Sequence, residues 1–243
     1  MRTRDTVTVV ACAAIIAASA FALIRELGPP TAKATAVAAV AAVPLRLPDG
    51  LSCEVYVPAS LDRSRKHPLV FGSSPSGNAG ELLTVWKDAC DRFQWILAAS
   101  NNFRNGKRSD KDAALQMETL SLLLRDYPVD EARVYATGLS GGGMHAHDLI
   151  ADYPKIFRGI VVNTGMMPHH WQGNDPFDVA HYPRGKLAVL LASPTDFRFK
   201  EMQEDRQLLE GLGWRVLWLE FKGGHAYAPP ESYVQAAAWL TAQ

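Results

Sequence analysis

The 243-residue sequence has no excess of charge of either sign. Lys and Arg together number 25, as do Asp and Glu, so the formal net charge is zero. A nucleic-acid-binding surface needs clustered positive charge, and no basic stripe runs along this chain. We therefore expect no nucleic-acid partner. The chain also lacks an internal repeat, which argues against a solenoid or propeller.

Cysteine is scarce as well. Cys12 lies near the N-terminus, and only Cys53 and Cys90 follow it. In an exported protein an even number of cysteines permits a disulfide, but buried free thiols fit equally well, since cysteine favours the interior. The sequence does not show whether the two side chains meet, so both alternatives stay open.

The spacing of histidines gives no metal motif. His145 and His147 are two positions apart in a stretch with helical character, so their side chains face different directions and make a poor metal pair. We expect a surface role for both. We predict neither a bound metal nor a cofactor.

The N-terminus has the pattern of an export leader. Arg2 and Arg4 precede an uncharged, Ala-, Val- and Ile-rich stretch from Thr6 to Ile24. We predict that residues 1–27 are a signal peptide that is cleaved or an anchor retained in the membrane. Residues 28–42, rich in Ala, Pro and Thr, are predicted to be a tether. The predicted localisation is secreted or periplasmic, with membrane attachment if the leader is retained.

Regular patterning begins at residue 43 and predicts one α/β domain over residues 43–243. An alternating pair of strands at 45–47 and 53–57, joined by Pro48-Asp49-Gly50, indicates an antiparallel hairpin. Strands then alternate with helices to the C-terminus, which implies a mostly parallel sheet with helices on both faces. The predicted strands are 68–71, 95–99, 133–137, 159–163, 187–192 and 215–221, and the predicted helices are 81–93, 111–125, about 141–153, 201–212 and 231–241.

One glycine-rich turn indicates catalysis. Gly138-Leu139-Ser140-Gly141-Gly142 fits the pattern G-x-S-x-G and lies between a predicted strand and a predicted helix. Such a turn holds its serine in a strained backbone conformation and projects the hydroxyl over the carboxyl edge of the sheet. The N–H of Gly141, at the start of a helix, would face a developing oxyanion. A glycine-rich turn without catalysis is the alternative.

A serine hydroxyl needs a base to remove its proton. Two later strands are each followed by a candidate partner, Asp196 after 187–192 and His225 after 215–221. The order Ser140, Asp196, His225 is the order of α/β-hydrolase triads. His225 would serve as general base and then general acid, and Asp196 would orient it. Asp205 is a weaker candidate because it lies within a helical pattern.

The segment Arg133–Gly143 resembles the nucleophile turn of the esterase/polyhydroxybutyrate depolymerase family of α/β-hydrolases, and Leu219–His225 resembles its histidine loop. This family includes feruloyl and acetylxylan esterases and is related to dienelactone-hydrolase-like enzymes. The likeness covers roughly residue 68 to the C-terminus. It implies an α/β-hydrolase fold and a carboxylic-ester hydrolase with Ser140, Asp196 and His225 as its triad.

The sequence departs from that family after the third strand. The family carries a His-Gly pair there, and the next residue donates the second oxyanion N–H, whereas this chain has Ser73-Ser74-Pro75-Ser76. An ungapped match makes Ser76 the first candidate donor and Ser74 the second. A shift by one residue would place Pro75 at the donor position, and proline has no N–H.

The substrate is less well defined by the sequence. No insertion is long enough for a full lid, and an open cleft would suit a small-molecule or polymeric ester. Trp171, Phe177 and Tyr182, in an irregular insertion at residues 166–186, could stack on an aromatic acyl group or a sugar, or could pack under their own loop.

The leading hypothesis is therefore an exported serine esterase that works through an acyl-enzyme. A serine peptidase of the same fold is the second hypothesis, because amide and ester cleavage share this machinery. A third is a non-catalytic envelope protein that retains the fold, since fold alone does not fix function.

Overall fold

The computed structural model describes residues 43–46, 52–105, 110–170 and 179–243. The predicted leader and tether lie outside these residues. Within the described part of the chain, no helix combines the length and the apolar character needed to cross a bilayer.

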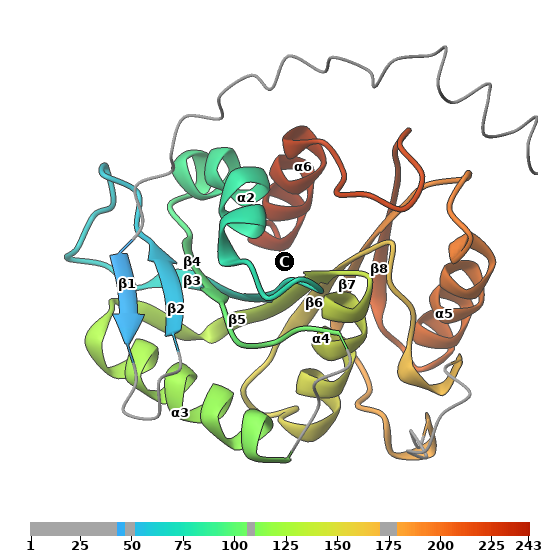
Figure 1. Ribbon diagram of the computed structural model, residues 1–243, viewed down its shortest axis with the longest axis horizontal. Coiled ribbons are helices and arrows are strands. Elements are labelled where there is room, and N and C mark those ends of the chain that lie inside the picture. Colours follow the sequence, from blue (N-terminus) through green and yellow to red (C-terminus); the bar gives the residue numbers. More distant parts are fainter. Residues whose placement is uncertain (1–42, 47–51, 106–109, 171–178) are drawn as a thin grey trace, which may run out of the picture. The chain divides into compact units, whose positions relative to one another are not determined.

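The described strands form one eight-stranded sheet in the order β1-β2-β4-β3-β5-β6-β7-β8 (Figure 1). The strands are β1 (Val43–Arg46), β2 (Ser52–Tyr56), β3 (His67–Ser73), β4 (Ile96–Ser100), β5 (Val129–Leu139), β6 (Gly159–Asn163), β7 (Leu187–Ala192) and β8 (Arg215–Glu220). The pairs β1–β2 and β2–β4 are antiparallel, and all other neighbours are parallel. The predicted N-terminal hairpin and parallel sheet are confirmed.

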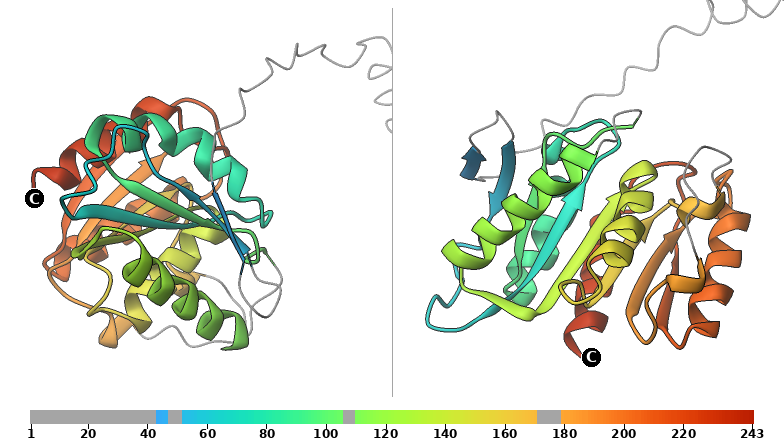
Figure 2. Two further views of the ribbon diagram at one scale, coloured as in Figure 1. Left: turned by 90° about the vertical axis from the view of Figure 1, so that its left-hand side faces the viewer. Right: turned by 90° about the horizontal axis from the view of Figure 1, so that it is seen from below.

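Helices cover both faces of the sheet. They are α2 (Ala79–Phe93), α3 (Asp110–Asp126), α4 (Gly141–Asp152), α5 (Phe199–Gly211) and α6 (Pro230–Thr241). One apolar cluster contains side chains of α2 and α6, and a second contains side chains of α3, α4 and α5. Helices α2 and α6 lie on one face of the sheet and α3, α4 and α5 on the other, as Figure 2 shows, so the two clusters lie on opposite faces.

Four inner strands of the sheet are buried along their whole length, which explains their apolar sequences. Every residue of β3, β4, β6 and β7 is buried. A parallel strand covered by helices on both faces has no solvent side, so its residues do not alternate between apolar and polar. Polar side chains at the carboxyl edge of the sheet therefore lie at or beyond the strand ends, where the chain leaves the sheet.

The two cysteines of the domain are buried free thiols. Cys53 lies in β2 and belongs to the cluster on the α3 face, whereas Cys90 lies in α2 and belongs to the cluster on the α2 face. The sheet thus separates them. Burial raises the pKa of Cys53 to about 12 and raises the pKa of Cys90 as well, so neither carries a thiolate near neutral pH.

This placement predicts slow thiol chemistry. In a full-length Cys12→Ser variant, we expect Cys53 and Cys90 to react with Ellman's reagent only after denaturation, because only the exposed thiolate attacks. Both thiols should then titrate without any reductant. If the unfolded chain shows no reactive thiol until a reductant is added, and then shows two, the cysteines instead form a disulfide.

Candidate active site

Ser140 stands at the turn between β5 and α4 in a backbone conformation that is rare for a residue with a side chain. Its φ is 52° and its ψ is −118°. Such angles cost of order 1–3 kcal/mol and persist only where surrounding structure imposes them. The Ser140 N–H donates to the carbonyl of Asn163 at 2.9 Å, and the Ser140 carbonyl accepts from Met144 N–H at 3.0 Å. The turn is therefore fixed on both sides.

The glycines around Ser140 allow backbone segments to approach one another closely. A Cβ on Gly142 would lie 2.0 Å from the carbonyl oxygen of Ser73, and a Cβ on Gly138 would lie 2.3 Å from the carbonyl carbon of Gly142. No side chain fits at either position. The end of β3 can therefore pack directly against the start of α4, which holds the turn in place.

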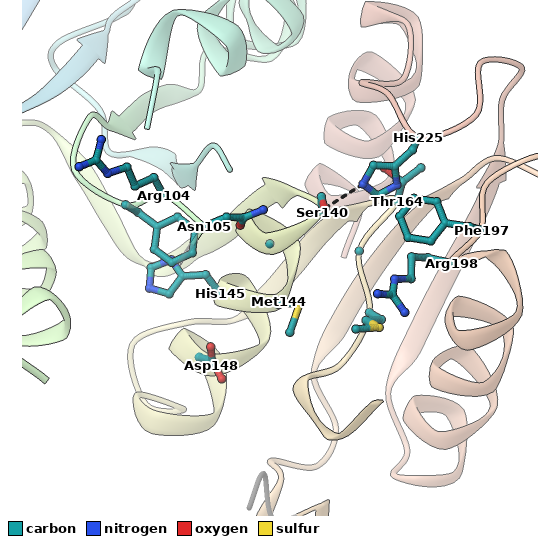
Figure 3. Close-up of a pocket in the computed structure, with 14 residues that line it drawn as sticks. Arg104, Asn105, Ser140, Met144, His145, Asp148, Thr164, Phe197, Arg198 and His225 are labelled. Carbon is teal, nitrogen blue, oxygen red and sulfur yellow. Dashed lines mark hydrogen bonds between the residues drawn. The ribbon is translucent and has the colours of Figure 1, made fainter. Parts of the chain in front are cut away.

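A chain of hydrogen bonds connects the three predicted residues. Ser140 Oγ lies 2.8 Å from His225 Nε2, a contact drawn as the dashed line in Figure 3. The other ring nitrogen, Nδ1, lies 2.7 Å from Asp196 Oδ2. A carboxylate can only accept, so Nδ1–H donates to Asp196, and Nε2 is left to accept the hydroxyl proton of Ser140. This arrangement can transfer a proton from serine to histidine.

Asp196 is placed by the turn after β7. Its side chain has 0 % of its surface exposed. Oδ1 accepts the backbone N–H of Arg198 at 2.6 Å, so both carboxylate oxygens have donors. A buried carboxylate with satisfied oxygens provides a fixed negative partner for the imidazole.

His225 follows β8 on a glycine turn. Gly224 has φ 65°, and its N–H donates to Ser193 Oγ at 3.0 Å. Next to His225, the carbonyl of Ala226 accepts Asn163 Nδ2–H at 3.0 Å. The loop is thus tied to the turn after β7 and to the end of β6, which fixes the position of the ring.

Asn163 is a functional residue that the sequence analysis missed. It is 1 % exposed at the end of β6, and its Oδ1 also accepts Ala228 N–H and Tyr233 O–H, each at 2.7 Å. Because its own carbonyl binds Ser140 N–H, one residue connects the serine turn to the histidine loop. A polar residue ending an otherwise apolar strand was the available signal.

A cavity of about 560 Å³ opens beside Ser140 and His225. Its lining is mainly apolar, with charged side chains as a minority. The apolar side chains are Phe103, Met144, Met166 and Phe197, and the charged ones are Arg104, Asp148 and Arg198. Phe197 is 65 % exposed, and its ring centroid lies 4.5 Å from that of His225. Figure 3 shows Phe197 and His225 on the same side of the cavity.

Among the residues predicted to contact substrate, the structure describes Tyr182 only. Of the two alternatives for Tyr182, stacking on substrate is corrected and packing inside the protein is found: Tyr182 is 3 % exposed, its hydroxyl lies 2.7 Å from His147 Nδ1, and its ring stacks on Trp214. Trp171 and Phe177 lie outside the described residues. Phe103 and Phe197 supply the aromatic lining instead. Each follows the carboxyl end of a strand, a position that could have identified them.

The structure also corrects the prediction for the second oxyanion donor. Neither Ser76 nor Ser74 lines the cavity. Ser74 is completely buried, and its hydroxyl donates to Glu81. The N–H of Ser76 donates to Ser74 Oγ at 3.2 Å, and its hydroxyl donates to Glu81 at 2.8 Å. The serines are held by the first turn of α2. Gly141, in contrast, lies at the cavity as predicted.

His145 and His147 are buried, contrary to the expected surface role. His145 is 7 % exposed, with Nδ1 3.0 Å from Ser73 Oγ and its ring stacked on Phe103. His147 is 0 % exposed, and its Nε2 has no hydrogen-bond partner among the described residues. Helix α4 is buried on more than one side, since every residue from His145 to Ile150 is buried, so both directions are covered. Periodicity alone did not identify this.

One group of described residues could offer three ligand atoms to a metal ion. The ligand atoms of His169, His170 and Asp205 lie within 4.8 Å of one another. However, Asp205 Oδ1 binds His170 Nε2 at 2.8 Å, and Oδ2 accepts Met167 N–H at 2.7 Å. These bonds already satisfy the buried carboxylate and connect the segment after β6 to α5. We interpret the group as a structural tether.

Taken together, the mostly parallel sheet, the strained serine turn after β5, and the acid and histidine after β7 and β8 define the α/β-hydrolase fold. No family model matches the sequence, and no curated protein matches it.

Solved structures agree on the fold. A thermostable esterase is 20 % identical with a TM-score of 0.63, over 85 % of this chain and 63 % of that one. This chain thus spans less than two thirds of that esterase. A ferulic acid esterase is 16 % identical with a TM-score of 0.64, over 83 % and 97 % of the two chains. LpqC, a poly(3-hydroxybutyrate) depolymerase from Bordetella parapertussis, is 16 % identical with a TM-score of 0.60, over 84 % and 90 %.

The close packing at the serine turn yields a testable prediction. A Gly142→Ala substitution should lower the free energy of unfolding by at least about 1–3 kcal/mol, because its Cβ would meet the backbone of Ser73. Gly211→Ala is the matched control: a Cβ there meets nothing within 4 Å, so stability should be unchanged or slightly higher. Urea unfolding of both variants measures the difference, and equal stabilities would contradict this packing.

The buried imidazole of His147 yields a further prediction. Burial disfavours its charged form and lowers its pKa from 6.5 to about 4. Between these pH values the unfolded chain binds the proton more readily, so stability falls as the pH falls. From pH 7 to pH 4 we expect the free energy of unfolding of the wild type to fall by about 3 kcal/mol more than that of His147→Asn. Denaturant unfolding at both pH values tests this, and a difference independent of pH would refute it.

Proposed function

We propose that this protein is a serine esterase that hydrolyses carboxylic esters through an acyl-enzyme. The observation that carries the proposal is the continuous hydrogen-bonded chain Ser140–His225–Asp196, built on a strained turn beside an open cavity. The names of the solved structures with the same fold, which include esterases and a polyester depolymerase, support this reaction class.

In the proposed reaction, Ser140 Oγ attacks the carbonyl carbon of the ester while its proton moves to His225 Nε2. The carbonyl electron pair moves to oxygen and forms a tetrahedral oxyanion. When the pair returns, the bond to the alkoxide breaks, and the alkoxide takes the proton from His225. Water then repeats the sequence on the acyl-enzyme and releases the acid. Asp196 keeps its charge and stabilises the imidazolium.

The cavity supports an ester with an apolar group. Phe103, Met144 and Met166 offer apolar and polarisable surface, and exposed Phe197 provides a ring at the opening. We propose either a small ester or the end of a polymeric one as substrate. From the leader-like pattern of residues 1–27 we further propose that the protein is exported.

The test uses the full-length chain and p-nitrophenyl acetate and butyrate. Ser140→Ala should lower kcat by roughly 10⁴-fold or more and abolish labelling by a fluorophosphonate probe. Ser121→Ala removes an exposed hydroxyl on α3 and should change neither. Equal ester hydrolysis by wild type and Ser140→Ala would refute the acyl-enzyme. Hydrolysis of a peptide panel in preference to the esters would favour the peptidase hypothesis.

A further inference from the structure

The oxyanion formed in the proposed reaction needs hydrogen-bond donors, and the backbone of this chain supplies one at the cavity. Gly141 N–H lies at the start of α4, where the first N–H groups of a helix have no partner within the helix. Because negative charge is also favoured at a helix N-terminus, this group suits a developing oxyanion. A second donor would have to lie next to Gly141 on the cavity side.

The loop after β3 offers no such backbone donor, because none of residues 74–78 lines the cavity. Pro75 has no N–H. The N–H of Ser76 is bound to Ser74 Oγ at 3.2 Å, and the N–H of Gly77 to the Ser74 carbonyl at 3.1 Å. Ser74 is completely buried, so its N–H cannot meet a substrate. A donor must therefore come from another part of the chain.

The side chain of Asn105 lies at the required position. A Cβ on Gly141 would be 1.8 Å from Asn105 Oδ1 and 3.3 Å from Nδ2, so the carboxamide rests directly against Gly141. Asn105 lines the same cavity as Ser140 and His225. Figure 3 shows its nitrogen end directed toward Ser140. No residue of the described chain hydrogen-bonds this carboxamide, and the residue is exposed, so the donor is available to a ligand.

The backbone of Asn105 is fixed by the same loop that lacks the donor. Its N–H donates to the Pro75 carbonyl at 2.9 Å. Asn105 thus bridges the loop after β3 and the serine turn, and its side chain enters the space from which a backbone N–H is missing. The presence of glycine at position 141 is also explained, because a side chain there would displace the Asn105 carboxamide.

From this geometry we propose that Asn105 is a catalytic residue whose Nδ2–H donates to the oxyanion together with Gly141 N–H. The inference rests on the proposed esterase function. A side-chain donor of this kind contributes mainly in the transition state, because charge develops on the carbonyl oxygen only there. Its removal should therefore lower kcat and leave KM nearly unchanged.

The experiment compares full-length wild type, Asn105→Ala and Asn105→Asp on p-nitrophenyl butyrate. We expect kcat to fall by about 10²–10³-fold in both variants, with KM within about threefold and the melting temperature unchanged. Asn105→Asp keeps the shape of the side chain and loses the donor, so shape alone would not rescue it. Gln207→Ala, which removes an exposed amide from α5, should behave as wild type.

A trifluoromethyl ketone inhibitor provides a second measurement. It forms a tetrahedral oxyanion on Ser140, so its affinity should fall in parallel with kcat/KM across the Asn105 variants. The proposal is overturned if Asn105→Ala retains kcat within threefold, if Asn105→Asp retains it, or if the loss appears in KM or melting temperature alone. Failure of the esterase function itself looks different, because wild type would then show neither hydrolysis nor labelling of Ser140.

Discussion

The backbone conformation of Ser140 is the constraint on which the rest of the site depends. At φ 52° and ψ −118°, Ser140 has a conformation that the backbone preferences of serine disfavour, so the surrounding structure must hold it. Contact between the end of β3 and the start of α4, permitted by Gly138 and Gly142, imposes the turn. The hydroxyl is thereby directed away from the buried sheet and into the cavity, so packing of the core determines where the chemistry can occur.

The remaining polar residues are arranged around this turn by hydrogen bonds among the loops of one sheet edge. Asn163 holds the serine turn through its carbonyl and the histidine loop through its side chain. Ser193, next to the Asp196 turn, holds Gly224. Each anchor sits at or just beyond the end of a fully buried strand. The rigid sheet therefore sets the distances between serine, histidine and aspartate.

The sequence was sufficient to predict the sheet, its crossover helices and the three residues that meet at its edge, because strand ends and glycine turns leave local patterns. It was not sufficient for groups that meet only in the folded chain. Tyr182 is an aromatic residue in an irregular insertion, as a cleft residue would be, yet its hydroxyl lies within hydrogen-bond distance of His147 in the interior. Likewise, Ser74 and Ser76 stand at the expected positions in the chain, but Glu81 binds both hydroxyls. Competition among hydrogen-bond partners is a property of three-dimensional structure.

Glu81 shows how this competition stabilises the edge. Its carboxylate accepts from Ser74 and Ser76 and also from Tyr227 O–H at 3.2 Å, two residues beyond His225. The loop after β3 and the loop after β8 are thus joined through one side chain on α2. Together with Asn163, this connection links the histidine loop to both sides of the serine turn. Such redundancy is the condition under which a strained backbone persists, because relaxing the turn would require several loops to move together.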